Sequence, residues 1–173
     1  MTRKWSDRRS NKKIKFDITL SELEFAQLER LKLKMEVDLY ATVMSNALRL
    51  YDDVVCQFAL SKVLRSVDPL GNEKGFELIP SKSISDATQV IALEIPQVFA
   101  VEVSKEKAQQ MTLEMPQKSV DRISVIMSQM EIDRNTIFVS ALSLLDQVIA
   151  GYEAGETFFL KDASGKMEEY EIF

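Results

Sequence analysis

An internal repeat constrains this fold more than any other feature of the sequence. Aligning the chain with itself at an offset of 94 residues gives nine identities between residues 40–79 and their counterparts, including Asp52 with Asp146. Further upstream an offset of 95 fits better and matches residues 35–38 with 130–133, which leaves one additional loop residue near Leu39. A tandem duplication of this kind restricts the chain to architectures that one small unit can build twice.

Both halves predict the same order of elements. Apolar and polar residues alternate over residues 13–20 and again over 110–115, which predicts strands with one apolar face. Two amphipathic helices follow each strand, because apolar positions then recur every three or four residues. The stripes of the first helices are Phe25, Leu28, Leu31 and Met35, and Val120, Ile123, Ile126 and Met130; those of the second helices are Val43, Ala47, Leu50 and Val54, and Ile137, Ala141, Leu144 and Val148.

Local signals predict where these elements begin and end. A capping box at Ser21 begins the first helix, and Pro116 begins its counterpart. Asp38 and Asp133 are expected to begin the second helices, and Gly151 to end the later one. A hairpin follows in each half, with strands over residues 63–67 and 76–79 and over residues 157–161 and 169–173.

One strand and two helices cannot stand alone, because the strand needs a neighbour and about 45 residues bury too little surface. We therefore predict an α+β fold of two strand-helix-helix units whose strands pair, each unit followed by a small β-hairpin. The predicted organisation is a basic arm (1–12), a first unit with its hairpin (13–79), a strand-bearing connection (80–108) and a second unit with its hairpin (109–173).

The connection allows two interpretations. Residues 89–96 and 98–103 both have strand-like composition, and these strands could join the hairpins in an additional sheet. A rival interpretation makes residues 99–103 the second paired strand and residues 105–114 a helix, although Pro116 would interrupt that arrangement.

The charge of the chain is unevenly distributed. Residues 1–16 hold seven basic residues against Asp7 alone, a balance of +6, so the remaining residues sum to −11. Residues 105–173 hold seven basic and twelve acidic side chains. We interpret residues 1–12 as a mobile arm that either follows nucleic-acid phosphates or only aids solubility.

Composition argues against an enzyme. The chain has no His, which removes triads and dyads built on imidazole and most zinc sites. Cys56 is the one cysteine, so no internal disulfide can form, and we expect a buried small side chain there rather than a reactive thiol. No cofactor or metal site is expected. No apolar run reaches the roughly 18 residues of a membrane span, so we expect no membrane association and a cytoplasmic protein.

These features resemble the ribbon-helix-helix DNA-binding family (MetJ/Arc type), here in tandem. The resemblance rests on residues 13–21 and 111–123 as strands leading into helices and on residues 42–50 and 136–144 as second helices. In that family two strands pair into an antiparallel ribbon that enters the DNA major groove. The resemblance implies a pseudo-dimer within one chain, with the strand near Phe16 paired to the strand near Leu113. The alternative is a ribbon formed between two chains in a homo-oligomer.

The resemblance also implies site residues. Outward positions of the ribbon would contact base edges: Lys13, Lys15, Asp17, Thr19, Gln110, Thr112 and Glu114. Phosphates would be held by the arm and by the first residues of the second helices: Arg3, Lys4, Arg8, Arg9, Lys12, Tyr40, Ala41, Thr42, Arg134, Asn135 and Thr136. The carboxylates of Asp17 and Glu114 are unusual on a ribbon that contacts DNA. Either each accepts a hydrogen bond from a cytosine amine, or the ribbon no longer binds DNA.

The predicted function is therefore a transcriptional regulator of a prokaryote, plasmid or phage that binds double-stranded DNA and lies at the nucleoid. The alternative is a protein-interaction module, antitoxin-like or an adaptor, that holds a protein partner through its hairpins or acidic surface. Met127 and Met130 are candidates to line a groove for such a partner.

Overall fold

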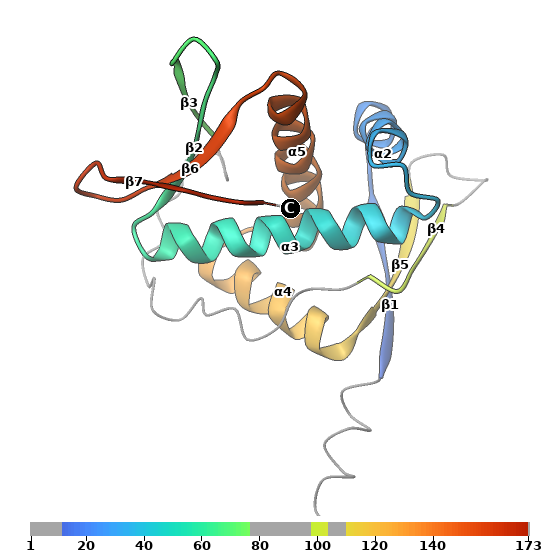
Figure 1. The fold of residues 1–173 in the computed structure, drawn as a ribbon. Helices are drawn as coiled ribbons and strands as arrows, with labels where there is room; N and C mark the ends of the chain where they lie inside the picture. The colour runs from blue at the N-terminus through green and yellow to red at the C-terminus, as the bar shows by residue number, and fades with distance from the viewer. Residues whose placement is uncertain (1–11, 77–97, 104–109, 173) are drawn as a thin grey trace, which may run out of the picture.

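The computed structural model describes residues 12–76, 98–103 and 110–172 (Figure 1). Over these residues the chain forms four helices and two antiparallel sheets, which confirms the α+β class. The elements are β1 (Lys13–Thr19), α2 (Glu22–Lys34), α3 (Tyr40–Ala59), β2 (Val63–Val67), β3 (Glu73–Gly75), β4 (Ala100–Val103), β5 (Gln110–Pro116), α4 (Gln117–Met130), α5 (Arg134–Glu153), β6 (Thr157–Lys161) and β7 (Met167–Glu169).

The first sheet has the strand order β1-β5-β4. β1 and β5 pair antiparallel with Phe16 opposite Leu113, as predicted for a ribbon formed within one chain. Asp17 lies opposite Thr112, and these two residues are 95 positions apart, which is the upstream offset of the sequence repeat. A pseudo-two-fold axis therefore passes between them.

The connecting strand corrects two expectations. β4 pairs with the outer edge of β5, so the expectation that residues 98–103 would join the hairpins is wrong. The rival interpretation is also wrong, because residues 110–114 belong to strand β5 and not to a helix. Residues 89–96 lie outside the described residues. The physical reason is that β5 has two edges, and only one of them is satisfied by β1.

The two hairpins lie side by side in a second sheet with the order β3-β2-β6-β7. β2 pairs with its counterpart β6, and Arg65 lies opposite Phe159, 94 positions away, at the downstream offset of the repeat. The outer strands begin earlier than predicted, at Glu73 and Met167, because tight turns close at Gly71 and Gly165, both at φ +87°. Both sheets thus join each half to the other.

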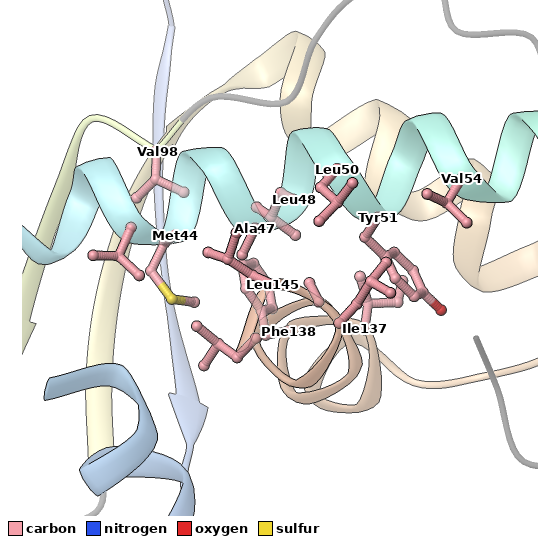
Figure 2. Packing of buried hydrophobic residues seen from close by; sticks show 14 of the residues in the cluster. Met44, Ala47, Leu48, Leu50, Tyr51, Val54, Val98, Ile137, Phe138 and Leu145 are labelled. Carbon is pink, nitrogen blue, oxygen red and sulfur yellow. The ribbon is translucent and has the colours of Figure 1, made fainter. Parts of the chain in front are cut away.

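The core lies between the halves. Helices α3 and α5 cross at the centre of the molecule, with the two sheets near opposite ends of α3 (Figure 1). Met44, Ala47 and Tyr51 of α3 point toward Phe138 and Leu145 of α5 (Figure 2). The apolar stripes of the second helices are buried as predicted, and the first helices contribute Leu28, Leu31, Ile123, Ile126 and Met130. The stripes that define the repeat therefore form one shared core.

The helix ends confirm some boundary signals and correct others. The capping box at Ser21 is present, and the Asp133 carboxylate accepts the N–H of Thr136 at 2.7 Å. Asp38 does not cap α3, because the additional residue, Leu39, takes the N-cap position. Gly151 does not end α5 but lies inside it, where a Cβ atom would come 2.5 Å from Glu156 Oε2 and 2.8 Å from the Phe158 ring. Close packing, and not termination, requires glycine there.

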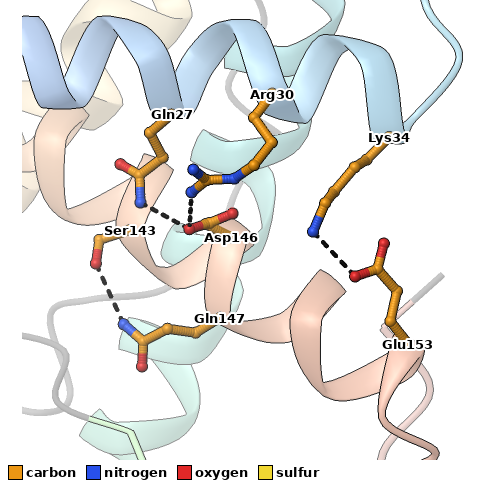
Figure 3. Close-up of polar contacts among 7 residues, drawn as sticks. All are labelled: Gln27, Arg30, Lys34, Ser143, Asp146, Gln147 and Glu153. Atoms are coloured by element: carbon orange, nitrogen blue, oxygen red, sulfur yellow. Dashed lines mark hydrogen bonds and ion pairs between the residues drawn. The ribbon is translucent and has the colours of Figure 1, made fainter.

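Polar contacts tie the first helix of each half to the second helix of the other. On α5, Asp146 accepts from Arg30 Nη2 at 2.6 Å and from Gln27 Nε2 at 3.0 Å (Figure 3). On α3 its counterpart, Asp52, accepts from Arg122 Nε at 2.8 Å and lies 2.7 Å from Nη2. Arg122 is itself the counterpart of Gln27 at the offset of 95. The two contacts are pseudo-symmetric, but only the Asp52–Arg122 pair is buried.

Candidate nucleic-acid interface

The polar face of the first sheet brings all seven predicted base-contact residues together. Facing pairs in β1 and β5 are Lys15 with Glu114, Asp17 with Thr112, and Thr19 with Gln110, and Lys13 follows at the end of the ribbon. The β1 side chains on this face are exposed, whereas those of β5 are half-buried. The opposite face of the ribbon, including Ile18 and Leu113, is buried in the core. Alternation in the sequence therefore located this surface correctly.

Several of these polar side chains contact one another. Lys13 Nζ and Lys15 Nζ lie 3.4 and 3.9 Å from the Glu114 carboxylate, and Thr112 Oγ1 donates to Asp17 at 2.6 Å. The lysine side chains remain 64% and 66% exposed, so these ion pairs are weak and the lysines can turn toward another anion. Glu114 therefore offsets part of the positive charge of the ribbon but does not hold either lysine side chain in place.

β4 changes both the charge and the width of this surface. Glu102 lies opposite Thr112 and is exposed, so two lysines share the face with the carboxylates of Asp17, Glu102 and Glu114. With strands about 4.8 Å apart, three strands measure roughly 10 Å between their outer axes, compared with about 12 Å for the width of the major groove. The exposed side chains of β1 are thus the part best placed to reach a duplex.

The first of the two predicted phosphate positions is the start of α3, at Tyr40, Ala41 and Thr42. No side chain caps this helix end, and Leu39 takes the N-cap position. The Tyr40 ring turns back onto α2, where its hydroxyl donates to Glu29. This hydrogen bond, together with burial, raises the pKa of Tyr40 to about 12. The start of α3 leaves the N-cap position free of a competing carboxylate.

The start of α5 is arranged differently. Asp133 caps the helix with its carboxylate, and hydrogen bonding to Thr136 lowers the pKa of Asp133. Asn135 Oδ1 accepts the backbone N–H of Thr19 at 2.8 Å. The Arg134 guanidinium lies 4.3 Å from the centre of the Phe16 ring and donates to the Asp17 carbonyl. These residues hold the start of α5 against the ribbon. The Asp133 carboxylate already occupies the position at which this helix N-terminus would bind an anion.

Of the five basic residues predicted in the arm, the structure describes Lys12. Arg3, Lys4, Arg8 and Arg9 lie outside the described residues. Lys12 is described and exposed, and its carbonyl accepts the Gln117 N–H at 2.9 Å, at the start of α4. Lys12 therefore lies beside the end of the ribbon that carries Lys13.

An open hollow of about 490 Å³ lies next to the ribbon, between β1, α4 and the start of α5. Its lining residues are Phe16, Asp17, Val120, Ile123, Ser124, Met127, Asp133, Arg134 and Asn135. Met127 lines this hollow, whereas Met130, the other methionine considered for a partner groove, is buried in the core. Periodicity assigned Val120 and Ile123 to the core, and the sequence named Met127 as a groove candidate without showing where such a groove would lie.

Comparisons of the chain with protein-family models, curated proteins and solved structures gave no match. Across residues 12–76, 98–103 and 110–172, no helix has the length and apolar character needed to cross a membrane. In the same residues no group of three or more Cys, Asp or Glu side chains gathers as metal ligands. Functional conclusions therefore depend on the geometry of the ribbon and its surroundings.

Proposed function

We propose that this protein is a DNA-binding regulator of the ribbon-helix-helix type in which one chain supplies both units. The supporting observation is the antiparallel pairing of β1 with β5 in the register that the repeat requires, with seven polar side chains on the outer face. A two-stranded antiparallel ribbon can enter the major groove, where the polar side chains of its outer face offer donors and acceptors to base edges.

In this proposal β1 makes the main base contacts. Lys13, Lys15 and Thr19 are exposed, whereas the β5 residues are half-buried and flanked by β4. Lysine donates to the guanine acceptors O6 and N7, and threonine can donate or accept. Asp17 can accept from a cytosine amine, which would add selectivity for bases at the cost of one more negative charge on the face.

Phosphate affinity comes mainly from the arm. The ribbon face has more carboxylates than lysines, so it cannot supply the counterion release that drives most DNA binding. The arm carries Arg3, Lys4, Arg8, Arg9 and Lys12, and its last residue, Lys12, lies beside the ribbon. Binding should therefore be weak without the arm and steeply dependent on salt.

A protein-interaction module on the same scaffold is the second candidate. The specific observation in its favour is β4, which widens the ribbon to three strands and adds Glu102 to a face already carrying Asp17 and Glu114. Such a surface suits a basic protein partner better than phosphate.

Fluorescence anisotropy with labelled duplex DNA over a salt series separates the two functions. DNA binding predicts a linear fall of log affinity with log salt, with each lost phosphate contact reducing the slope by about 0.9. The variant Lys13→Ala/Lys15→Ala and deletion of residues 1–12 should both weaken binding. The matched control Lys62→Ala/Lys166→Ala removes the same charge next to the second sheet, at the residue before β2 and in the turn between β6 and β7, and should bind as the wild type does. No binding at low salt by the wild-type protein would refute DNA binding and favour the protein partner.

A further inference from the structure

The hollow beside α4 has a counterpart in the first half of the chain, and that counterpart is filled. On α2 the ring of Tyr40 contacts three residues: Phe25, with ring centres 6.2 Å apart, Glu29, which accepts its hydroxyl hydrogen bond, and Lys32, whose Nζ lies 4.6 Å from the ring centre. An aromatic side chain thus occupies the angle between the first helix and the start of the second.

At the offset of 95, the three residues that contact Tyr40 correspond to three of the nine residues that line the hollow. Phe25 corresponds to Val120, Glu29 to Ser124 and Lys32 to Met127. The α4 side of the hollow is therefore the second copy of a surface on α2 that, in the first half, holds an aromatic ring, and the residue type differs at all three positions.

The ring itself is missing from the second half. At the offset of 94, Tyr40 corresponds to Arg134. The Arg134 guanidinium turns toward β1 instead of α4, lying 4.3 Å from the centre of the Phe16 ring and donating to the Asp17 carbonyl. Among the described residues, a volume of about 490 Å³ between α4 and β1 is open, which is within the usual range for binding sites.

We propose that this hollow is a docking site for an aromatic side chain, specifically tyrosine, presented by a protein partner. Val120 and Ile123 supply apolar surface, and the Met127 sulfur makes a favourable contact with an aromatic edge. Ser124 Oγ donates to the Val120 carbonyl at 3.0 Å and keeps lone pairs that can accept from a phenol. The inference depends on the internal comparison alone and stands whether or not the protein binds DNA.

Methyl NMR of the full chain labelled at methionine tests the chemistry of the site. The probes are N-acetyl-tyrosinamide and, as the matched control, N-acetyl-leucinamide. We expect a saturable shift of the Met127 methyl resonance with the tyrosine probe, with a dissociation constant on the order of 1–10 mM, and a much smaller shift with the leucine probe. The Met44 methyl, in the core, should not move. Equal responses to the two probes, or none, would overturn the proposal.

Two substitutions at one position separate occupation of the hollow from general damage. Arg134→Tyr restores the residue type that fills the first half and should abolish the shift caused by the tyrosine probe. Arg134→Leu removes the same guanidinium without filling the hollow and should keep that shift. If Arg134→Tyr binds the probe as the wild type does, the internal comparison fails.

The source of the aromatic group is tested in the free protein. A protein partner predicts that Met127 keeps its resonance in Trp5→Ala and on dilution. A change in Trp5→Ala would identify the chain's own arm as the occupant, and a change on dilution would identify a second copy. Either result would overturn the proposal of a separate partner.

Discussion

The pseudo-symmetric Arg–Asp contacts between the halves allow a prediction with a built-in control. Asp52 is 3% exposed and Arg122 8% exposed, and burial raises the pKa of the Asp52 carboxyl, with the Arg122 guanidinium opposing part of that rise. Arg122→Ala leaves this carboxylate buried without its partner. Breaking a buried pair in this way costs about 3–5 kcal/mol, because the remaining charge stays desolvated.

Loss of the Arg30–Asp146 contact should lower the free energy of unfolding far less. Arg30 reaches Asp146 at 2.6 Å, but the Arg30 side chain is 50% exposed. Arg30→Ala should cost about 0–1 kcal/mol, because water and salt compensate exposed ion pairs. For a chain of this size the difference corresponds to a Tm lower by roughly 5–20 °C in Arg122→Ala than in Arg30→Ala.

Urea unfolding followed by circular dichroism measures both variants, and its pH dependence supplies a second test. The raised pKa of Asp52 means that the ionised form is disfavoured in the folded protein, so stability recovers as Asp52 takes up a proton. The deficit of Arg122→Ala relative to wild type should therefore be largest at neutral pH and shrink as pH falls through the folded pKa of Asp52. Equal losses in the two variants, or a deficit that grows in acid, would refute the reasoning.

Three further predictions concern packing and titration. Gly151→Ala should lower stability by about 1–3 kcal/mol in urea unfolding, because its Cβ would lie 2.8 Å from the Phe158 ring, whereas Ala150→Gly, at the neighbouring position, should cost only about 1 kcal/mol; a neutral Gly151→Ala would show that the ring yields freely. Asp162→Ala should destabilise the protein at neutral pH and progressively less in acid. Hydrogen bonds from Ser164 lower the pKa of Asp162, and the stability that they contribute disappears as the carboxylate is protonated. A loss of stability that does not depend on pH would contradict this. Tyr40→Phe should remove an absorbance transition near pH 12 from the tyrosinate titration, because the Glu29 hydrogen bond raises the pKa of Tyr40 to about 12. The stability that this hydrogen bond contributes should persist below pH 10 and disappear as Tyr40 ionises. An unchanged transition would refute the assignment.

Much of the fold followed from periodicity, because burial of a stripe on a strand or helix depends on local spacing. The strand pairing near Phe16 and the core stripes of α3 and α5 are in this class. The failures were contacts that spacing does not encode. Gly151 was interpreted as a helix stop because nothing in the local sequence shows that the Phe158 ring packs against it. β4 was assigned to another sheet because strand composition does not specify which edge a strand will join.

The candidate site followed from the sequence only in part. Alternation located the polar face of the ribbon, yet it could not show that Glu114 pairs with Lys13 and Lys15 or that Arg134 turns onto Phe16. The hollow beside α4 lies where the halves differ, with Tyr40 in the first half and Arg134 in the second. A repeat therefore predicts shared structure well, and its departures from symmetry have to be located in three dimensions.

Lysine acetylation footprinting with and without duplex DNA tests the central claim most directly. If the outer face of the β1–β5 ribbon binds DNA, then Lys13 and Lys15 should react more slowly at low salt in the presence of the duplex, while Lys62 and Lys166 next to the second sheet react as before. Protection of Lys62 and Lys166, with Lys13 and Lys15 reacting at unchanged rates, would contradict the account.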